Sequence, residues 1–258
     1  MTQNDMPKIK NYPLYIYRVF VKWISFFIFG FGTVLIGLLL FPVMSLFVHP
    51  EERFKKKGRA IISAVWYGFC KVMCFLGGVA IELDNKQAYK NLSSKIIVAN
   101  HPSLLDVVMI ISLIPNADCI VNASLKRNIV NGVIRRIYIS NSLEFSELSA
   151  RCKKTLDEGN CLVIFPEGSR TPRTGHLPLK RGAARISVLT QNPIIPIRIG
   201  GNDKWGLGKH DPWTAYNHSE KYIYKISMLD EISPEKYSEL PVPIATRRIT
   251  EDLEKLLF

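Results

Sequence analysis

The chain has 258 residues, 47% of them hydrophobic, which allows one large domain, or one domain with an appendage, built around a sizeable core. Its formal net charge of +12 favours a polyanionic partner, such as nucleic acid, an anionic membrane surface or an acidic protein. The cysteines are five, an odd number, and three lie in apolar runs, which argues against a disulfide framework and favours reduced, buried thiols.

The first predicted element is a membrane-seeking helix. Residues 24–48 carry no charge, and residues 24–41, ISFFIFGFGTVLIGLLLF, are almost wholly apolar. At about 1.5 Å per residue this stretch covers about 27 Å, close to the hydrocarbon thickness of a bilayer. We expect Pro42 to kink or end the helix. A secretory signal peptide fits poorly, because the apolar stretch is too long, begins late and lacks small residues at a cleavage position.

A second apolar run, residues 60–81, carries Lys71 at its centre. A lone lysine is costly at the middle of a bilayer, so we interpret this run as an interfacial helix, or as the return arm of a shallow hairpin with Lys71 snorkelling. A single membrane span is the alternative. Basic residues precede the first helix and fill the link 49–60, which suits a hairpin with both ends at the cytoplasmic face, against anionic lipid headgroups. Nucleic acid is a poor explanation of charge that flanks lipid-seeking helices.

The rest of the chain alternates short β-branched runs with helical stretches. The predicted strands are residues 79–83, 96–99, 119–121, 137–139, 161–165, 194–199 and 222–228, and the predicted helices include 146–158, 183–189 and 245–257. This alternation predicts an α/β fold with a largely parallel sheet flanked by helices, after an N-terminal membrane-associated helical hairpin. We expect membrane-anchoring helices in residues 1–76 and a catalytic domain in residues 77–258. Sites in such sheets gather beyond the carboxyl ends of the strands.

The first such strand end carries a group of polar residues. Asn100, His101, Ser103 and Asp106 follow the apolar strand 96–99 and precede another apolar stretch. One interpretation is structural: Ser103 caps the next helix, Asp106 completes a capping-box-like start, and His101 is an ordinary loop residue. The other is that His101 and Asp106 form a catalytic pair.

The second strand end runs directly into Pro166-Glu167-Gly168-Ser169-Arg170. Gly168 allows a tight turn, and Arg170 offers a planar fork of donors that suits a carboxylate or a phosphate. A solvated turn with a surface ion pair is the plainer interpretation of this loop.

Several classes of chemistry lack their sequence signals. The chain has no Gly-x-Ser-x-Gly elbow, no phosphate-cradling Walker loop and no glycine-rich dinucleotide fingerprint. The other histidines are scattered without metal-like spacing. The chemistry that remains is a histidine general base oriented by a carboxylate, with no covalent enzyme intermediate, no metal and no cofactor.

These segments resemble the lysophosphatidic acid acyltransferase family of glycerolipid acyltransferases. Residues 100–106, NHPSLLD, are similar to the family's NHx4D motif, and residues 165–170, FPEGSR, are similar to its FPEGTR motif. Residues 179–184 resemble the stretch that follows, and residues 193–197 resemble the later strand motif, with Pro196 at the matching place. The resemblance covers roughly residues 20–200, including the apolar N-terminal helices.

The resemblance implies a role for each matching residue. His101 takes the proton from the acceptor hydroxyl, and Asp106 orients the imidazole and stabilises its charged form. The acceptor is held by Glu167, Gly168, Ser169 and Arg170. Supporting positions are Asn100, Ser103, Lys180, Gly182 and Pro196. The hydroxyl attacks an acyl thioester of coenzyme A or of acyl carrier protein, which is a substrate and not a cofactor.

One family motif matches badly. The family has a strand ending in arginine, thought to help hold the acceptor, where residues 132–141 read GVIRRIYISN and end in Asn141. Lys126, Arg135 or Arg136 would be the substitutes for that cation. The departure affects the identity of the acceptor more than the reaction.

We therefore expect a membrane-associated O-acyltransferase that acts on a lyso-glycerophospholipid such as lysophosphatidic acid, at the cytoplasmic face of the inner membrane. A different, phosphate-free lyso-lipid is an alternative acceptor. A non-catalytic membrane adaptor of the same fold is the rival from another class, and a thioesterase or phospholipase, with water replacing the acceptor, is a third.

Overall fold

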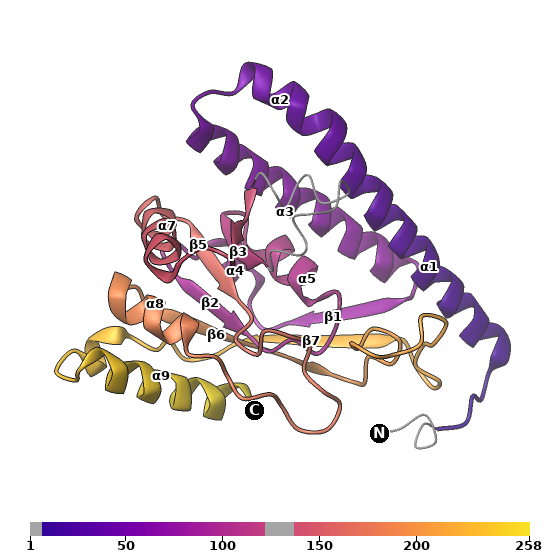
Figure 1. The fold of residues 1–258 in the computed structure, drawn as a ribbon. Coiled ribbons are helices and arrows are strands. Elements are labelled where there is room, and N and C mark those ends of the chain that lie inside the picture. Colours follow the sequence, from indigo (N-terminus) through magenta and orange to yellow (C-terminus); the bar gives the residue numbers. More distant parts are fainter. Residues whose placement is uncertain (1–6, 122–136) are drawn as a thin grey trace.

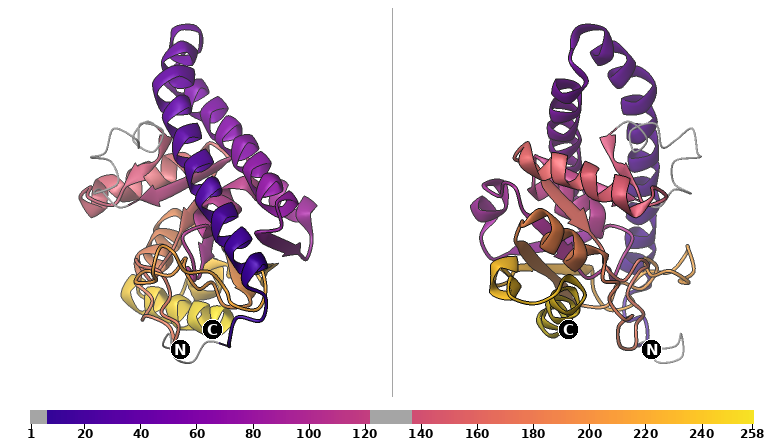
Figure 2. Two further views of the ribbon diagram at one scale, coloured as in Figure 1. Left: turned by 90° about the vertical axis from the view of Figure 1, so that its right-hand side faces the viewer. Right: turned by 60° about the vertical axis from the view of Figure 1, so that its left-hand side comes forward.

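The computed structural model describes residues 7–121 and 137–258. It opens with a helical hairpin. The first arm comprises α1 (Tyr12–Leu35), a π-helical segment (Ile36–Leu40) and α2 (Phe41–Phe47), and the second arm is α3 (Glu51–Phe75). The hairpin leans along the sheet and projects beyond it at the turn between its arms (Figures 1 and 2).

Pro42 does not end the first arm, contrary to one of the two outcomes expected from the sequence. The helix continues to Phe47, and the five residues before Phe41 form the wider π-helical turn. A proline has no N–H for the ordinary hydrogen bond four residues back, and a π-helical turn is one way in which a helix absorbs such an interruption. Residues Tyr12–Phe47 are the one helix in the described part of the chain that is long and apolar enough to cross a membrane.

The second arm is amphipathic. One face of α3, with Ile62, Trp66, Phe69 and Met73 at spacings of three and four, is buried. Lys71 lies on the exposed side, with its Nζ 5.7 Å from the centre of the Tyr67 ring. The return arm predicted from the sequence is therefore present, and its buried face belongs to the same hydrophobic cluster as the sheet. The division into units 1–76 and 77–258 stays a prediction.

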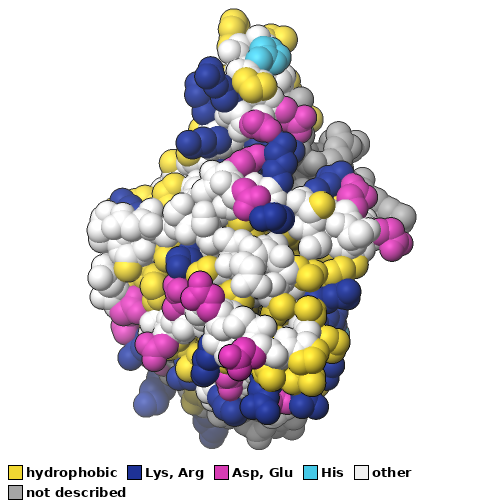
Figure 3. Space-filling view, turned by 90° about the vertical axis from the view of Figure 1, so that its left-hand side faces the viewer, with side chains coloured by type: hydrophobic (Ala, Val, Ile, Leu, Met, Phe, Trp, Pro, Cys, Tyr) yellow, Lys and Arg dark blue, Asp and Glu magenta, His cyan; other side chains and the backbone are white. Residues whose placement is uncertain are grey.

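The hairpin is also tied to the rest of the chain near its turn. Lys154 on α7 (Phe145–Asp157) forms an ion pair of 2.6 Å with Glu52 at the start of α3. Figure 3 shows this side of the molecule, where hydrophobic side chains lie at the projecting tip and charged side chains of both signs lie just below it. The charged flank therefore accompanies α3 almost to the turn.

The sheet has seven strands and is largely parallel, as predicted. The strands are β1 (Val79–Leu83), β2 (Ile96–Ala99), β3 (Ala117–Val121), β4 (Ile139–Ser140), β5 (Cys161–Ile164), β6 (Ile194–Gly201) and β7 (Tyr222–Met228). Their spatial order is β1-β7-β6-β2-β5-β3-β4. Adjacent strands in the described residues are parallel, except for β6 and β7, which are antiparallel.

Helices cover both faces of the sheet (Figure 1). Side chains alternate along β2: Ile97 and Ala99 join the cluster that includes α3 and α5 (Asp106–Leu113), while Ile96 and Val98 join the cluster on the opposite face. That second cluster includes residues of α7, α8 (Gly182–Thr190) and α9 (Val242–Leu257). A short helix, α4 (Lys86–Lys90), precedes β2. Burial on both faces explains why the central strands are apolar without interruption.

Candidate active site

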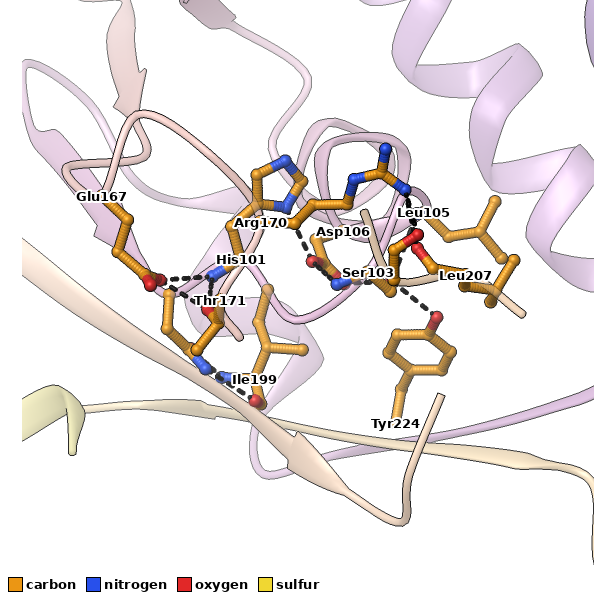
Figure 4. Close-up of polar contacts among 12 residues, drawn as sticks. His101, Ser103, Leu105, Asp106, Glu167, Arg170, Thr171, Ile199, Leu207 and Tyr224 are labelled. Atoms are coloured by element: carbon orange, nitrogen blue, oxygen red, sulfur yellow. Dashed lines mark hydrogen bonds and ion pairs between the residues drawn. The ribbon is translucent and has the colours of Figure 1, made fainter. Parts of the chain in front are cut away.

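The two polar strand ends meet at the carboxyl edge of the sheet. β2 and β5 are adjacent and parallel, so the segments that follow them, residues 100–106 and 165–171, leave the sheet side by side. Thr171 N donates to His101 O at 2.7 Å, which links the two segments directly. The sheet topology, and not the local sequence, therefore brings the NHPSLLD and FPEGSR segments together (Figure 4).

His101 and Asp106 form a close pair. His101 Nδ1 lies 2.8 Å from Asp106 Oδ2, and the imidazole is 18% exposed while the carboxylate is fully buried. A carboxylate at this position favours a hydrogen on Nδ1, which leaves Nε2 as the basic nitrogen of the ring. The Phe165 ring packs against the imidazole, with 4.5 Å between ring centres. The arrangement suits a general base that is held in one tautomer.

Asp106 is also bound by Ser103. Ser103 N donates to Asp106 Oδ2 and Ser103 Oγ donates to Asp106 Oδ1, both at 2.6 Å. Ser103 is not the cap of the helix, which was one of the two interpretations of this segment, because α5 begins only at Asp106 with Leu105 at the N-cap position. The serine instead supplies two donors to the carboxylate that faces the histidine, so the polar group serves both the turn and the pair.

The network extends to β7 through Tyr224. The hydroxyl of this tyrosine lies 2.7 Å from Ser103 Oγ. Burial, followed by the nearby charge of Asp106, raises the pKa of Tyr224 well above its ordinary value, so the phenol stays protonated. Since Ser103 Oγ donates to Asp106, it accepts from the phenol. A buried chain of donors therefore leads from Tyr224 to the carboxylate.

Replacing Tyr224 by phenylalanine should slow turnover about 3- to 10-fold, because Ser103 loses the donor that orients its hydroxyl toward Asp106. The change should appear in kcat and not in KM. Tyr222→Phe is the matched control on the same strand, since its hydroxyl bonds to Trp205 O and not to the catalytic network. Equal losses in the two variants would show that Tyr224 acts only through packing.

Glu167 lies behind His101 and is 4% exposed. Its Oε1 accepts from His101 N at 3.1 Å and from Thr171 Oγ1 at 2.5 Å, and its Oε2 accepts from Leu177 N at 3.4 Å. These contacts hold the backbone of His101 against residues 167–177. The acceptor-binding role expected for Glu167 stays a prediction.

Asn100 fixes the same turn from the other side. Its amide donates to Ile199 O at 2.9 Å and accepts from Ile199 N at 2.7 Å, so it extends the pairing between β2 and β6 by one side chain. Pro196 lies within β6, opposite Val98 of β2. Asn100 and Pro196, two of the five predicted supporting residues, thus lie along the contact between β2 and β6.

Gly168 and Lys180 lie beside one another. Gly168 has φ +68°, in the left-handed region that favours glycine, and a Cβ there would meet the side chain of Lys180. Lys180 is exposed, its N donates to Pro166 O at 2.9 Å, and Gly182 begins α8 two residues later. The absence of a side chain at Gly168 therefore leaves room for the Lys180 side chain beside residues 165–171.

Arg170 is half-buried. Its Nη1 donates to Leu207 O at 2.9 Å and to Gly208 O at 2.8 Å, in the loop between β6 and β7. Burial lowers the pKa of Arg170, against the opposing effects of Asp211 and Asp106, but an arginine remains charged. Figure 4 shows Arg170 together with its partner Leu207 and the His101–Asp106 pair.

Two cavities flank the site. The apolar cavity, of about 610 Å³, extends from His101, Ser169 and Lys180 to the hairpin. Its other lining side chains are mainly apolar and include Phe29, Trp66, Val107, Ile120, Phe145, Leu148, Ile164 and Ile186. Asn141, the residue that departs from the family pattern, also lies on its wall.

The polar cavity, also of about 610 Å³, lies beyond Ser169 and Arg170. Its charged lining residues are Arg170, Arg173, Asp203, Lys204, Lys209 and Asp211. Arg173 is engaged by Asp203 and Asp211, whereas Lys204 is buried against the Tyr224 ring. Burial lowers the pKa of Lys204 to about 8, opposed by the charges of Asp106, Asp203 and Glu220. The cationic substitutes expected from the sequence, Lys126, Arg135 and Arg136, lie outside the described residues.

Sequence reasoning missed the residues that hold this site from β7 and the β6–β7 loop. Tyr224, Leu207 and Lys204 belong to no motif, and each reaches the site through the sheet topology. The alternation of tyrosines at 222 and 224 in a predicted strand was the available signal, and it indicates a shared face but no partner. In residues 7–121 and 137–258, His, Cys, Asp and Glu form no group that suits a metal ion.

Comparisons with known proteins agree with this geometry. Residues 80–200 match the family model described as Acyltransferase. A putative 1-acyl-sn-glycerol-3-phosphate acyltransferase of Caenorhabditis elegans is 27% identical over 167 residues, which cover 61% of this chain and 60% of that protein. The 1-acyl-sn-glycerol-3-phosphate acyltransferase of Helicobacter pylori is 28% identical over 219 residues, 81% of this chain and 86% of that protein. The chain thus spans less than two thirds of the C. elegans relative.

The fold itself has a solved counterpart. The crystal structure of the 1-acyl-sn-glycerophosphate acyltransferase of Thermotoga maritima matches with a TM-score of 0.69 and 20% sequence identity. The match covers 93% of this chain and 95% of that one. The shared architecture therefore includes the hairpin as well as the sheet.

Proposed function

Because this chain belongs to the lysophosphatidic acid acyltransferase family of glycerolipid acyltransferases, we propose that it transfers a fatty acyl group from an acyl thioester to the hydroxyl of a lyso-glycerophospholipid. The observation that carries this proposal is the His101–Asp106 pair, which is buried on its acidic side and opens on its basic side into a large apolar cavity.

The reaction needs one proton to change place. His101 Nε2 takes the proton of the acceptor hydroxyl while the oxygen attacks the thioester carbonyl, since a hydroxyl is too weak an acid to ionise first. The C–O bond forms, the tetrahedral intermediate collapses, and the C–S bond breaks. The imidazolium then gives its proton to the departing thiolate. Asp106 stabilises the charged ring between the two transfers.

The two cavities suit the two ends of the substrates. The apolar cavity accommodates an acyl chain, with its far wall made by the hairpin. The polar cavity, which contains Arg170, faces the position of a headgroup. We place the phosphate of the acceptor against Arg170 and the thioester above His101. Coenzyme A and acyl carrier protein are both acceptable donors in this arrangement.

The hairpin supports membrane attachment. The outward face of α1 and α2 is apolar over its whole length, with Phe20, Phe27, Phe31 and Phe47 exposed. The charged flank formed by Glu52 and Lys154 makes full insertion of the hairpin costly. We therefore propose that the outward face lies in one leaflet, at the cytoplasmic surface of the inner membrane. Of the two alternatives, this proposal takes the hairpin that does not cross over the single span.

A single assay tests the reaction. The purified protein is given a radiolabelled acyl donor, as coenzyme A or acyl carrier protein thioester, and a panel of lyso-lipids. Acylated lipid supports the proposal. Release of free fatty acid in place of acylated lipid would identify a hydrolase, and the absence of turnover with every donor and acceptor would favour the adaptor.

The acceptor is tested with Arg170→Lys. Lysine cannot reproduce the planar fork of donors, so we expect a loss of about 10-fold in kcat/KM for lysophosphatidic acid. The loss for monoacylglycerol should be much smaller, because that acceptor has no phosphate. Asn141→Arg is the reciprocal variant and should favour the phosphorylated acceptor. A higher specificity constant for monoacylglycerol in the wild type would overturn the phosphate assignment.

A further inference from the structure

The β6–β7 loop, residues 202–221, exposes one large apolar side chain. Trp205, Leu207 and Tyr216 in this loop are buried, whereas Trp213 is 67% exposed. One side of the Trp213 ring contacts α1, with its ring centre 6.3 Å from that of Trp23 and 6.1 Å from that of Phe26. We call these three residues the aromatic cluster. It joins a loop of the catalytic part to the membrane helix.

The aromatic cluster continues the apolar face of α1. Phe20, Trp23, Phe27 and Phe31 follow one another at spacings of three and four residues and are all exposed. Residues at these spacings share one side of a helix. Trp213 widens this stripe sideways at Trp23. Contiguous exposed apolar surface of this kind marks an interaction site.

The position of Trp213 is fixed by its backbone. Lys22 of α1 is buried, and its Nζ donates to Trp213 O at 2.7 Å and also to Ala215 O. His218 Nδ1 is 2.9 Å from Pro7 O, which ties the far end of the loop to the start of the chain. The loop is therefore held on α1 by contacts that do not involve the indole. The indole is therefore exposed even though the loop is held in place on α1.

The chemistry of the surface favours a lipid bilayer as the occupant. An indole is apolar with one polar N–H, and tryptophan concentrates where hydrocarbon meets headgroups. Lys8 and Lys10, just before α1, and Lys209, in the β6–β7 loop, are exposed and suit anionic headgroups. Of the three acidic side chains in the loop, Asp203 and Asp211 are engaged by Arg173 and Glu220 is exposed, so the basic character of this surface comes from Lys8, Lys10 and Lys209.

We propose that the β6–β7 loop is a second membrane contact, in which Trp213 enters the headgroup region of an anionic bilayer beside α1. This goes beyond the proposed reaction and does not depend on it. The same loop holds the site, because Leu207 O accepts from Leu104 N at 3.1 Å and from Arg170 Nη1 at 2.9 Å. The bilayer contact thereby sets the height of Arg170 above the lipid.

Tryptophan fluorescence tests this contact without any substrate. The chain has four tryptophans, at positions 23, 66, 205 and 213, and three are replaced by phenylalanine to leave Trp213 alone. The protein is transferred from detergent to phosphatidylglycerol vesicles whose acyl chains carry bromine. We expect Trp213 emission to shift to the blue and to be quenched, most strongly by bromine near the headgroups. A chain that keeps only the buried Trp205 is the matched control and should be unaffected.

A second design keeps the chain nearly intact. Wild type and Trp213→Phe are compared on the same vesicles, and the variant should lose a quenchable component that Trp205→Phe retains. Trp213 emission that bromine leaves unchanged, while the protein floats with the vesicles, would overturn the proposal and leave α1 as the membrane contact. Equal quenching of Trp213 and Trp205 would also overturn it, since that result reports loosening of the whole fold.

Discussion

Replacement of His101 by alanine should lower kcat for acyl transfer by at least about 10²- to 10⁴-fold, the range that general-base catalysis contributes. The imidazole provides the nitrogen that takes the hydroxyl proton, and neighbouring groups offer no equivalent base within the described site. Folding should be little affected, because the side chain lies at the mouth of the apolar cavity and not within a hydrophobic cluster. Single-turnover kinetics with a labelled donor, and the thermal unfolding midpoint, measure the two effects.

Asp106→Asn is the informative companion to this variant. An asparagine side chain cannot accept from both Ser103 and the imidazole as a carboxylate does, so the ring loses its orienting charge. We expect strongly slowed transfer with an almost unchanged KM for the donor. Near-normal turnover in His101→Ala would contradict the general-base role and leave the histidine as a loop residue beside a helix start.

Replacement of Arg59 by methionine should destabilise the fold by about 3–5 kcal/mol, the usual cost of leaving one member of a buried ion pair alone. Arg59 on α3 and Asp118 on β3 are 3% and 4% exposed, with Arg59 Nη1 3.2 Å from Asp118 Oδ2. Burial raises the pKa of Asp118 to about 6, more than the attraction of Arg59 lowers it. The pair joins the hairpin to the sheet, and the attraction of Arg59 only partly offsets the cost of burying the Asp118 carboxylate. Urea unfolding measures the stability lost when Arg59 is replaced.

The pH dependence of this effect has a definite sign. A carboxyl whose folded pKa lies above its unfolded value of 3.8 costs stability as the pH rises between those values. Without Arg59 the folded pKa rises further, so the deficit of Arg59→Met should be larger at pH 8 than at pH 5. Adding Asp118→Leu should restore much of the stability, because both charges are then absent. Lys153→Met, which breaks an exposed pair with Asp157, should cost at most about 0.5 kcal/mol.

A deficit that is the same at both pH values would show that Arg59 contributes through packing alone. An Arg59→Met variant no less stable than the exposed control would show that the pair is not buried in solution.

The sequence predicted the parts of the fold that local patterns determine. The β-branched runs and the amphipathic stretch 146–158 correspond to strands and to α7, because periodicity reports burial on one face or on both. It left open whether Pro42 kinks or ends the first helix, because the π-helical turn that absorbs the proline has no sequence pattern. Of the two interpretations of residues 100–106, the capping one does not hold, since Ser103 is bound to Asp106 and does not cap α5.

The contacts of the site also divide into those that a short segment predicts and those that depend on the sheet topology. His101 and Asp106 are five residues apart, so their pairing could be expected from one short segment. The contacts of Tyr224 with Ser103 and of Leu207 with Arg170 join segments 121 and 37 residues apart, and no short-range pattern encodes them. The charged residues of the polar cavity come from separate loops, so no single motif of the sequence contains them all.

The place of β1 in the sheet has a consequence for the order in which the protein is made. β1 leaves the hairpin early in the chain, yet the strand that pairs with it is β7, the last to be synthesised. Pairing between strands far apart in the sequence is slow, and an unpaired strand edge is prone to aggregation until its partner is in place. The apolar hairpin is available to a membrane throughout this interval. The attachment to lipid proposed above would thus precede closure of the sheet.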